Sequence, residues 1–359
     1  MISCKALTQN LQIDPQGFVR ICCQSANKLV HIRDLEQLSD IFDLPAYNDI
    51  QTTMNTTWHP NCNLCKVHEE TAGTSRRDSY NEWILPKQFR LDINCGNQCN
   101  LNCRMCTPGN STSWISDAKK LAEKDIHFQT AHIMSHELSK EDIEKILTFI
   151  KNSDADFFIE LKGGEPFIMP RTEYFIEQLL LLPNANKISL EIVSNGTRVP
   201  TWIDKINKFK EFNLVLSFDG VDEVYSYIRN AEWHKFVTNL TTFKKYINTP
   251  IILHTTLQNY NIHQYYIMKE FSDDNLCTWS NNILIRPNFL AINVLSPSAK
   301  EHVLKIMHNS RLVSIISKDY EPALLDKFYN YTNELDNYRN QNLSSTIPHL
   351  SNTISGFNL

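Results

Sequence analysis

The chain has 359 residues, of which 42% are hydrophobic, enough for a sizeable core in one large domain or two. Its net charge of −5 is mild and gives no sign of a nucleic-acid-binding protein. The N-terminus lacks the apolar core of a signal peptide, and no apolar run is long enough to cross a bilayer. Since ten cysteines in such a chain favour metal ligation in a reducing compartment, we expect a cytoplasmic protein without a membrane partner.

The first 88 residues are expected to form a small cysteine-rich module. Leu11–Val19 has the pattern of a short hairpin, with Asp14-Pro15-Gln16-Gly17 as its turn. Cysteines stand before the hairpin, after it and at the end of the module. Four of them could supply ligands: Cys4, either Cys22 or Cys23, Cys62 and Cys65. Four thiolates suit a closed iron–sulfur cluster, and they equally suit a structural zinc ion.

A second group, Cys99, Cys103 and Cys106, follows a predicted strand at Phe89–Cys95. Three thiolates within eight residues favour a loop that closes around one soft metal centre. Their spacing fits neither a zinc ribbon nor the common ferredoxin runs. Three cysteines leave the fourth iron of a cubane open for a small molecule, which indicates chemistry rather than scaffolding.

From Phe89 onward, apolar strand patterns alternate with helical ones. The predicted strands are Phe89–Cys95, Asp156–Lys162, Lys187–Val193, Asn213–Phe218, Ile251–Leu257 and Ile283–Leu290. The predicted helices are Ser113–Lys124, Ser139–Lys151, Arg171–Leu182, Thr201–Phe209, Glu232–Tyr246 and Ile262–Phe271. Repeated units of this kind predict an α/β fold with a parallel sheet, whose function lies on the loops after the strands.

Polar motifs follow three of these strands. Gly163-Gly164-Glu165 ends the second strand, where the glycines let the backbone approach a ligand and Glu165 can pair with a cation. Ser194-Asn195 ends the third strand. Ser217 ends the fourth, and Arg229 follows as a suitable partner for a carboxylate.

Together, these motifs resemble those of the radical S-adenosylmethionine (SAM) superfamily. The resemblance rests on Cys-x3-Cys-x2-Cys with Met105 before the last cysteine, and on the Gly-Gly-Glu motif after the next strand. It implies a partial (β/α)6 barrel over residues 89–295 and a [4Fe-4S] cluster whose open iron binds SAM. It also implies that Gly163, Gly164 and Glu165 hold the SAM ammonium. The remaining cofactor contacts that it implies are Met105, Ser194, Asn195, Ser217 and Arg229.

The module at 1–88 resembles the twitch and SPASM auxiliary-cluster modules. There a cysteine follows the hairpin glycine by five positions, as Cys22 follows Gly17, so Cys22 is preferred to Cys23, which is expected to be a buried small hydrophobe. In most relatives such a module follows the barrel, whereas here it comes first. The stretch Glu69 to Arg77 also resembles N-terminal twitch proteins, without a role that the residues reveal.

Other positions carry weaker signals. His254 and Gln258, at the end of the fifth strand, are possible substrate contacts, and Cys95 and Cys277 are expected to be inert. Residues 296–338 are expected to be helical, and Asn340–Leu359 to be a polar, mobile tail.

The resemblance implies an enzyme that reductively cleaves SAM and abstracts a substrate hydrogen. A peptide or protein substrate is the leading hypothesis, because relatives with auxiliary clusters often act on ribosomal peptides; a small metabolite is the other, and flavodoxin or ferredoxin is the expected electron donor. Two alternatives stay open: a zinc-binding structural or interaction protein, and an iron–sulfur electron carrier that does not cleave SAM. Neither explains why polar motifs end three successive strands after the cysteine loop.

Overall fold

The computed structural model describes residues 2, 4–128 and 135–351. The chain forms two compact units. The first comprises Met1–Gln98, Ser135–Ser194 and Pro200–Leu214, and the second comprises Cys99–Met134, Asn195–Val199 and Val215–Leu359. The chain therefore passes between units next to two predicted motifs, at Gln98–Cys99 and at Ser194–Asn195.

The first unit is built on a sheet with strand order β3-β2-β1-β4-β5-β6. Its strands are β1 (Asn10–Ile13), β2 (Phe18–Arg20), β3 (Val30–His31), β4 (Gln88–Asn94), β5 (Asp156–Lys162) and β6 (Ile188–Ser194). The predicted hairpin is present, because β1 and β2 pair antiparallel. Strand β1 also pairs with β4 in parallel, as β4 does with β5 and β5 with β6. The N-terminal hairpin and the later strands thus share one sheet.

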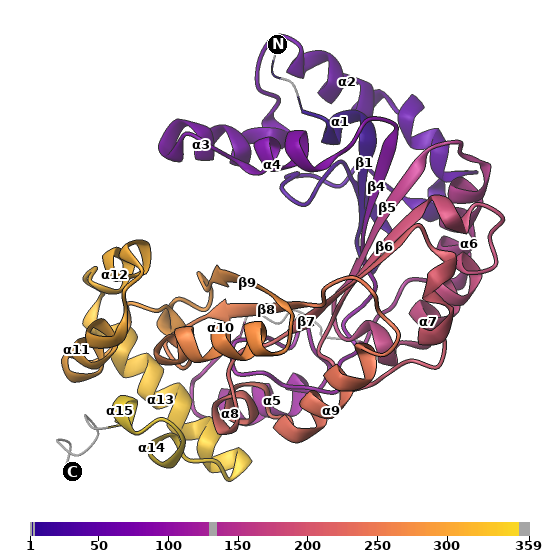
Figure 1. The fold of residues 1–359 in the computed structure, drawn as a ribbon. Helices are drawn as coiled ribbons and strands as arrows, with labels where there is room; N and C mark the ends of the chain where they lie inside the picture. Colours follow the sequence, from indigo (N-terminus) through magenta and orange to yellow (C-terminus); the bar gives the residue numbers. More distant parts are fainter. Residues whose placement is uncertain (1, 3, 129–134, 352–359) are drawn as a thin grey trace. The chain divides into compact units, whose positions relative to one another are not determined.

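Along the central strands of the first unit, successive side chains point alternately to an apolar face and to a polar face of the sheet. Apolar side chains such as Leu91, Ile159 and Leu190 are fully buried, and helices α6 and α7 cover their side of the sheet (Figure 1). Phe149 of α6 packs against Phe89 and Phe157. We call the opposite side the polar face; among its residues are Gln12, Arg90, Asp92, Asn94, Glu160, Lys162 and Glu191.

The helices of the first unit are α1 (Ala6–Gln9), α2 (Pro45–Met54), α3 (Asn63–Ala72), α4 (Arg76–Trp83), α6 (Lys140–Asn152) and α7 (Pro170–Leu179). Ser139 caps α6, and its side chain accepts a hydrogen bond from the Asp142 N–H. Helices α2, α3 and α4 were not predicted. Their polar composition masks a narrow buried stripe, to which α2 contributes Tyr47, Ile50 and Met54.

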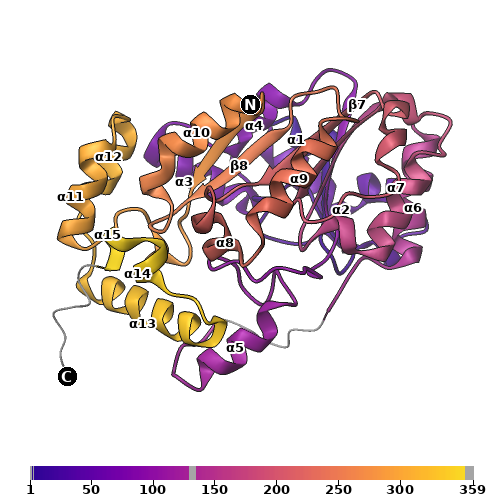
Figure 2. The ribbon, with the colours of Figure 1, turned by 60° about the horizontal axis from the view of Figure 1, so that its bottom comes forward.

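The second unit contains the parallel strands β7 (Glu211–Ser217, which begins in the first unit), β8 (Ile252–Leu257) and β9 (Thr278–Ile283). Its helices are α5 (Trp114–Ala122), α8 (Glu223–Arg229), α9 (Trp233–Phe243), α10 (Tyr265–Asp274), α11 (Pro297–Ile306), α12 (Ser310–Ile316), α13 (Pro322–Arg339), α14 (Leu343–Thr346) and α15 (Pro348–Ser351). Figure 2 shows α5 beside the C-terminal end of α13, with which it packs. The parallel strands and interleaved helices of the two units confirm the α/β fold class.

Three predicted segments were wrong. The sixth strand is Thr278–Ile283 rather than Ile283–Leu290, because Pro287 cannot donate to a ladder and Ile285 is 79% exposed. The segment predicted as helix Thr201–Phe209 is a 3₁₀ helix at Ile203–Lys208. Part of the predicted polar tail is helical, as α14 and α15, because Leu343, Ile347 and Leu350 are buried; residues 352–359 lie outside the described residues.

Candidate functional site

The three-cysteine loop lies in the second unit, and its thiols are close neighbours. Cys106 lies close enough to Cys103 and Cys99 for the charge of either thiolate to raise the pKa of Cys106. The Leu101 N–H donates to Cys99 Sγ at 3.4 Å, and Asn195 Nδ2 lies 3.8 Å from the same sulfur. Burial raises the pKa of Cys103 to about 11 and the pKa of Cys106 to about 12. These thiols therefore hold their protons at neutral pH until a metal centre displaces them.

Side chains just after the loop fix its backbone. Ser111 Oγ donates to the Leu101 carbonyl at 2.6 Å, and Ser113 Oγ donates to the Cys99 carbonyl at 2.7 Å. The buried Trp114 indole N–H donates to the Cys103 carbonyl at 2.8 Å. The carbonyls of two of the three cysteines are thus held in place, which pre-orients their thiols.

Arg104, inside the cysteine motif, anchors the loop to the C-terminal helices. Its side chain is fully buried, and Nη2 forms an ion pair with Asp336 of α13. Nε donates to the Tyr227 carbonyl at 3.0 Å, and the guanidinium lies 3.6 Å from the centre of the Tyr227 ring. Tyr331 of α13 donates to the Arg104 carbonyl. Arg339, also on α13, donates to the Asn102 carbonyl at 2.6 Å. Helix α13 therefore braces the middle of the loop, at Asn102 and Arg104.

Sequence reasoning did not find this brace. Arg104 and Asp336 are separated by 232 positions, and no local pattern pairs a helix aspartate with an arginine inside a cysteine motif. The one available signal was a charged residue between closely spaced cysteines, which requires a partner if the loop is buried.

Asn195 and Arg229 lie in the second unit with the loop. Asn195 Nδ2 also donates to Asn100 Oδ1 at 3.0 Å, which ties the end of the third predicted strand to the loop. Arg229 is buried, and its guanidinium pairs with Asp219 at 2.5 Å, while its carbonyl accepts from the Cys103 thiol at 3.7 Å. Asp219 in turn accepts from the Thr256 N–H at 2.9 Å. Ser217 ends β7, paired in register with His254.

The Gly-Gly-Glu motif lies in the first unit. Gly163 and Gly164 have φ of 91° and 44°, and a Cβ on Gly164 would stand 2.3 Å from the Gln98 carbonyl oxygen. The Glu165 N–H donates to that oxygen at 2.7 Å. Glu165 Oε1 accepts from the Phe167 N–H at 3.0 Å and from Ser194 Oγ at 2.8 Å. Two predicted motifs, Gly163–Glu165 and Ser194, are thus joined through one oriented carboxylate.

The four N-terminal cysteines lie together in the first unit. Cys4, Cys22, Cys62 and Cys65 line one largely apolar cavity, together with Trp58, Arg77 and Tyr80 among others. Burial raises the pKa of Cys4, of Cys22 and of Cys62, the last to about 11. The charges of Cys4 and Cys65 raise the pKa of Cys22 and of Cys62 further. Cys23 does not line the cavity; it is half-buried, and its sulfur lies 3.5 Å from the Tyr80 hydroxyl.

The stretch from Glu69 to Arg77 forms the connection between α3 and α4. Gly73 ends α3 at φ 74°, and Ser75 caps α4 through a capping box with Asp78. Arg77 Nε and Nη2 contact the two carboxylate oxygens of Glu69 at 2.8 and 2.9 Å. The Arg77–Glu69 ion pair joins α4 to α3. Because Cys65 is also on α3 and Arg77 lines the cysteine cavity, this ion pair holds the two helices together beside the thiols.

The remaining candidates from the sequence are His254, Gln258, Cys95 and Cys277. His254 Nδ1 lies 2.7 Å from Ser280 Oγ, and burial lowers the pKa of His254. The Gln258 amide is fully buried, and among the described residues neither its oxygen nor its nitrogen has a hydrogen-bond partner. Cys95 is buried and Cys277 is half-buried.

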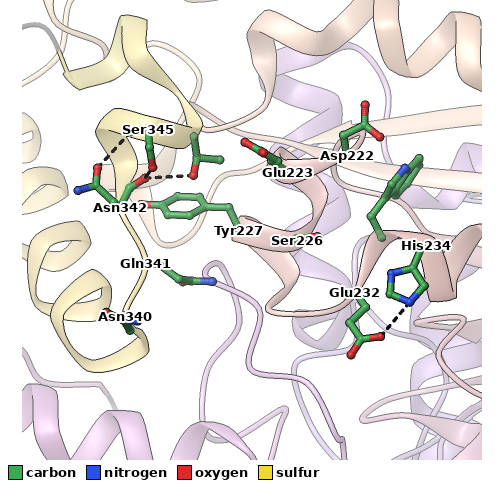
Figure 3. Close-up of a pocket in the computed structure, with 12 residues that line it drawn as sticks. Asp222, Glu223, Ser226, Tyr227, Glu232, His234, Asn340, Gln341, Asn342 and Ser345 are labelled. Carbon is green, nitrogen blue, oxygen red and sulfur yellow. Dashed lines mark hydrogen bonds and ion pairs between the residues drawn. The ribbon is translucent and has the colours of Figure 1, made fainter.

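An open pocket of about 740 Å³ lies in the second unit (Figure 3). Its walls come from α8 and from the segment after α13, and Glu232 pairs with His234 at 3.3 Å on its rim. Two wall residues, Tyr227 and Gln341, also bind Arg104, Gln341 at 2.8 Å. The residues that hold Arg104, and with it the cysteine loop, therefore also form part of the pocket wall.

Both cysteine groups have the donor set of an iron–sulfur site. Three thiols without a fourth cysteine fit a cluster with one open iron, and four thiols fit a closed one. Across residues 2, 4–128 and 135–351, no three His, Cys, Asp or Glu side chains are arranged to hold a metal ion. The cysteine ligands of a cubane bind different irons, so they stand farther apart than the ligands of one ion.

No helix in the described part of the chain is long and apolar enough to span a membrane.

The radical SAM superfamily model matches residues 93–271, a span that includes the cysteine loop and the three strand-end motifs. No curated protein matches the chain. Among solved structures, anSMEcpe with bound AdoMet is 17% identical with a TM-score of 0.42, covering 69% of this chain and 60% of that one. Streptococcus suis SuiB bound to precursor peptide SuiA is 14% identical with a TM-score of 0.41, covering 88% of this chain and 57% of that one. This chain thus spans about three fifths of the length of each.

Proposed function

Because this chain belongs to the radical SAM superfamily through residues 93–271, and its cofactors are accordingly a [4Fe-4S] cluster and SAM, we propose that it reductively cleaves SAM and abstracts a hydrogen atom from a peptide substrate. The observation that carries the proposal is the loop of Cys99, Cys103 and Cys106, which offers three neighbouring thiols on a braced backbone inside the matched span. When bound, the cluster supplies the electron that cleaves SAM.

The chain's own residues bind and orient these groups. Cys99, Cys103 and Cys106 would hold the cluster, with Asn195 close to the Cys99 sulfur. Glu165, held by Ser194 and the Phe167 N–H, would receive the SAM ammonium, and the glycines before it leave room for the ligand backbone. Met105, Ser217 and Arg229 are the remaining proposed contacts.

A second, closed cluster is proposed at Cys4, Cys22, Cys62 and Cys65. The shared cavity of these four thiols supports it. A small metabolite is the other candidate substrate class, and flavodoxin or ferredoxin is the proposed electron donor. The cytoplasm is the proposed location.

The direct test is anaerobic reconstitution with iron and sulfide, followed by metal analysis and an assay for 5′-deoxyadenosine after addition of dithionite and SAM. We expect about eight irons per chain and formation of the nucleoside. Zinc without iron, and intact SAM, would instead establish a zinc-binding structural protein. Iron with intact SAM would establish an electron carrier.

Glu165→Gln tests the assignment of the SAM ammonium. The amide oxygen can still accept from Ser194 and Phe167, so the site keeps its shape while the charge is lost. We expect SAM affinity, measured by equilibrium dialysis, to fall by roughly tenfold or more, as for loss of a buried charge-assisted contact. Glu177→Gln, at an exposed position on α7, should bind SAM like the wild type.

A further inference from the structure

The C-terminal end of α8 packs against the three-cysteine loop. The Arg104 N–H donates to the Ile228 carbonyl at 2.8 Å, and the Cys103 thiol donates to the Arg229 carbonyl at 3.7 Å. Tyr225 stands four positions before Arg229 on this helix, so the two side chains lie on the same face. The helix therefore brings Tyr225 to the loop together with Arg229.

Aromatic packing fixes the ring of Tyr225. The residue is fully buried, and its ring centre lies 5.2 Å from that of Trp233 and 4.9 Å from that of Phe236, both on α9. Contacts of this kind inside a close-packed core leave a ring little freedom to move. The position of the hydroxyl is thus set by the fold, and solvent does not reach it.

The Tyr225 hydroxyl is an unpaired buried donor. Among the described residues it makes no hydrogen bond of ordinary geometry, and neither does the Nε–H of Arg229, although the two side chains are neighbours. A buried donor left unpaired carries its full desolvation cost, so such donors are rare in native proteins. Two of them on one face of one helix indicate that a ligand bound at the loop supplies an acceptor.

Cys103 is the group whose charge reaches both donors. Burial raises the pKa of Tyr225 and Arg229 lowers it, while the charges of a Cys103 thiolate and of Asp219 raise it. Burial lowers the pKa of Arg229, and the charge of the same thiolate is the largest of the effects that raise it. Asp219 already accepts from Arg229 and from the Thr256 N–H. A cysteine bound to iron is a thiolate, so the Cys103 sulfur of the loaded protein is the acceptor that suits the Tyr225 hydroxyl.

We propose that Tyr225 is a positioning residue whose hydroxyl donates a hydrogen bond to the Cys103 sulfur of the bound cluster and so makes the cluster easier to reduce. This inference rests on the proposed function and deepens it at the same site. The reduced cluster carries one more negative charge than the oxidised one. A donor at a cysteine sulfur therefore stabilises the reduced state more and raises the reduction potential.

Tyr225→Phe tests the inference, because it removes the hydroxyl and keeps the ring that packs against α9. The measurement is a redox titration of the full-length reconstituted protein with dithionite, without SAM, followed by electron paramagnetic resonance. The signal of the loop cluster is the one missing when Cys99, Cys103 and Cys106 are replaced by alanine. We expect the equilibrium constant for one-electron reduction to fall about tenfold, which lowers the midpoint potential by about 59 mV.

Tyr246→Phe is the matched control, since this tyrosine is 44% exposed, and it should keep the midpoint potential of the wild type. In Tyr225→Phe, iron content and SAM affinity, measured by equilibrium dialysis, should also equal those of the wild type. An unchanged or higher midpoint potential would overturn the inference. Loss of loop iron would instead assign the hydroxyl to holding the loop, and loss of SAM affinity at an unchanged potential would assign it to SAM; either would overturn the inference as well.

The two proposals fail in different ways. The titration needs only the bound cluster and no SAM cleavage, whereas failure of the proposed function appears as zinc in place of iron, or as iron with intact SAM.

Discussion

The two cysteine sites of this chain are built on different physical principles. The four-cysteine site of the first unit lies in a largely apolar cavity, and its nearby ion pair, Arg77 with Glu69, is about one fifth exposed at each side chain. The three-cysteine loop of the second unit is held by hydrogen bonds to its own carbonyls, and its ion pair, Arg104 with Asp336, includes a guanidinium that is completely buried.

This difference is the one that the two proposed clusters, one closed and one open, would require. Four thiols complete a cluster by themselves, so packing alone can surround them. Three thiols must present an open iron to a ligand, so their backbone needs support that does not depend on the cluster being enclosed. The buried brace from α13 supplies that support.

The largest difference between the two sites is expected when each set of cysteines is replaced by alanine in turn. Replacing Cys99, Cys103 and Cys106 by alanine should remove about four irons and all 5′-deoxyadenosine formation, while about four irons stay in the N-terminal module. Replacing Cys4, Cys22, Cys62 and Cys65 should remove the other four irons. Metal analysis and the nucleoside assay measure both. Loss of all iron from either variant, or of none, would contradict two independent sites.

The buried brace gives the next largest effect. Asp336→Asn leaves Arg104 charged and without a counterion in the interior, so we expect the free energy of unfolding to fall by about 3–5 kcal/mol. Iron at the three-cysteine loop should be lost on dilution, whereas iron at the N-terminal site should stay. Urea titration and metal analysis test both.

The matched control is Asp326→Asn, at an exposed position on the same helix. It should unfold like the wild type, within about 0.5 kcal/mol. If Asp336→Asn also matched the wild type and retained loop iron, the brace would have no role in holding the loop.

The sequence predicted what repeats locally and missed what depends on distant pairs. Strands β4 and β5 were found because strongly apolar residues alternate within them, and helix α6 was found because the helical pattern of Ser139–Lys151 is local. The thiol sets and the Gly-Gly-Glu motif were also local. Helix α13 was expected, yet its brace to Arg104 was not, since only the fold brings Asp336 to that guanidinium.

The polar face shows the same limit. Alternation along β5 indicates that Glu160 and Lys162 share one side of the strand, but not which neighbours lie beside them. The register that sets Glu191 opposite Glu160 is a property of the folded sheet. The ninth strand was misplaced for a related reason: Thr278–Ile283 is largely polar at its exposed positions, and its pairing with β8, rather than its hydrophobicity, makes it a strand.

The partly exposed pair at the four-cysteine site should give the smallest effect. Glu69→Gln should lower the free energy of unfolding by only about 0.2–1 kcal/mol, and less in high salt, because solvent screens the pair. Hydrogen bonding from Arg77 lowers the pKa of Glu69 below its unfolded value, so the stabilisation is complete at neutral pH. It should be lost as pH falls below about 4.3 toward the lower pKa of the folded state. Urea titrations at two salt concentrations and several pH values measure this loss of stability.

Glu70→Gln, next in the chain and 61% exposed at its side chain, is the control and should change the free energy of unfolding little. A loss at Glu69 as large as that expected at Asp336, insensitive to salt, would show that the first unit also depends on a desolvated brace, and the contrast between the two sites would fail.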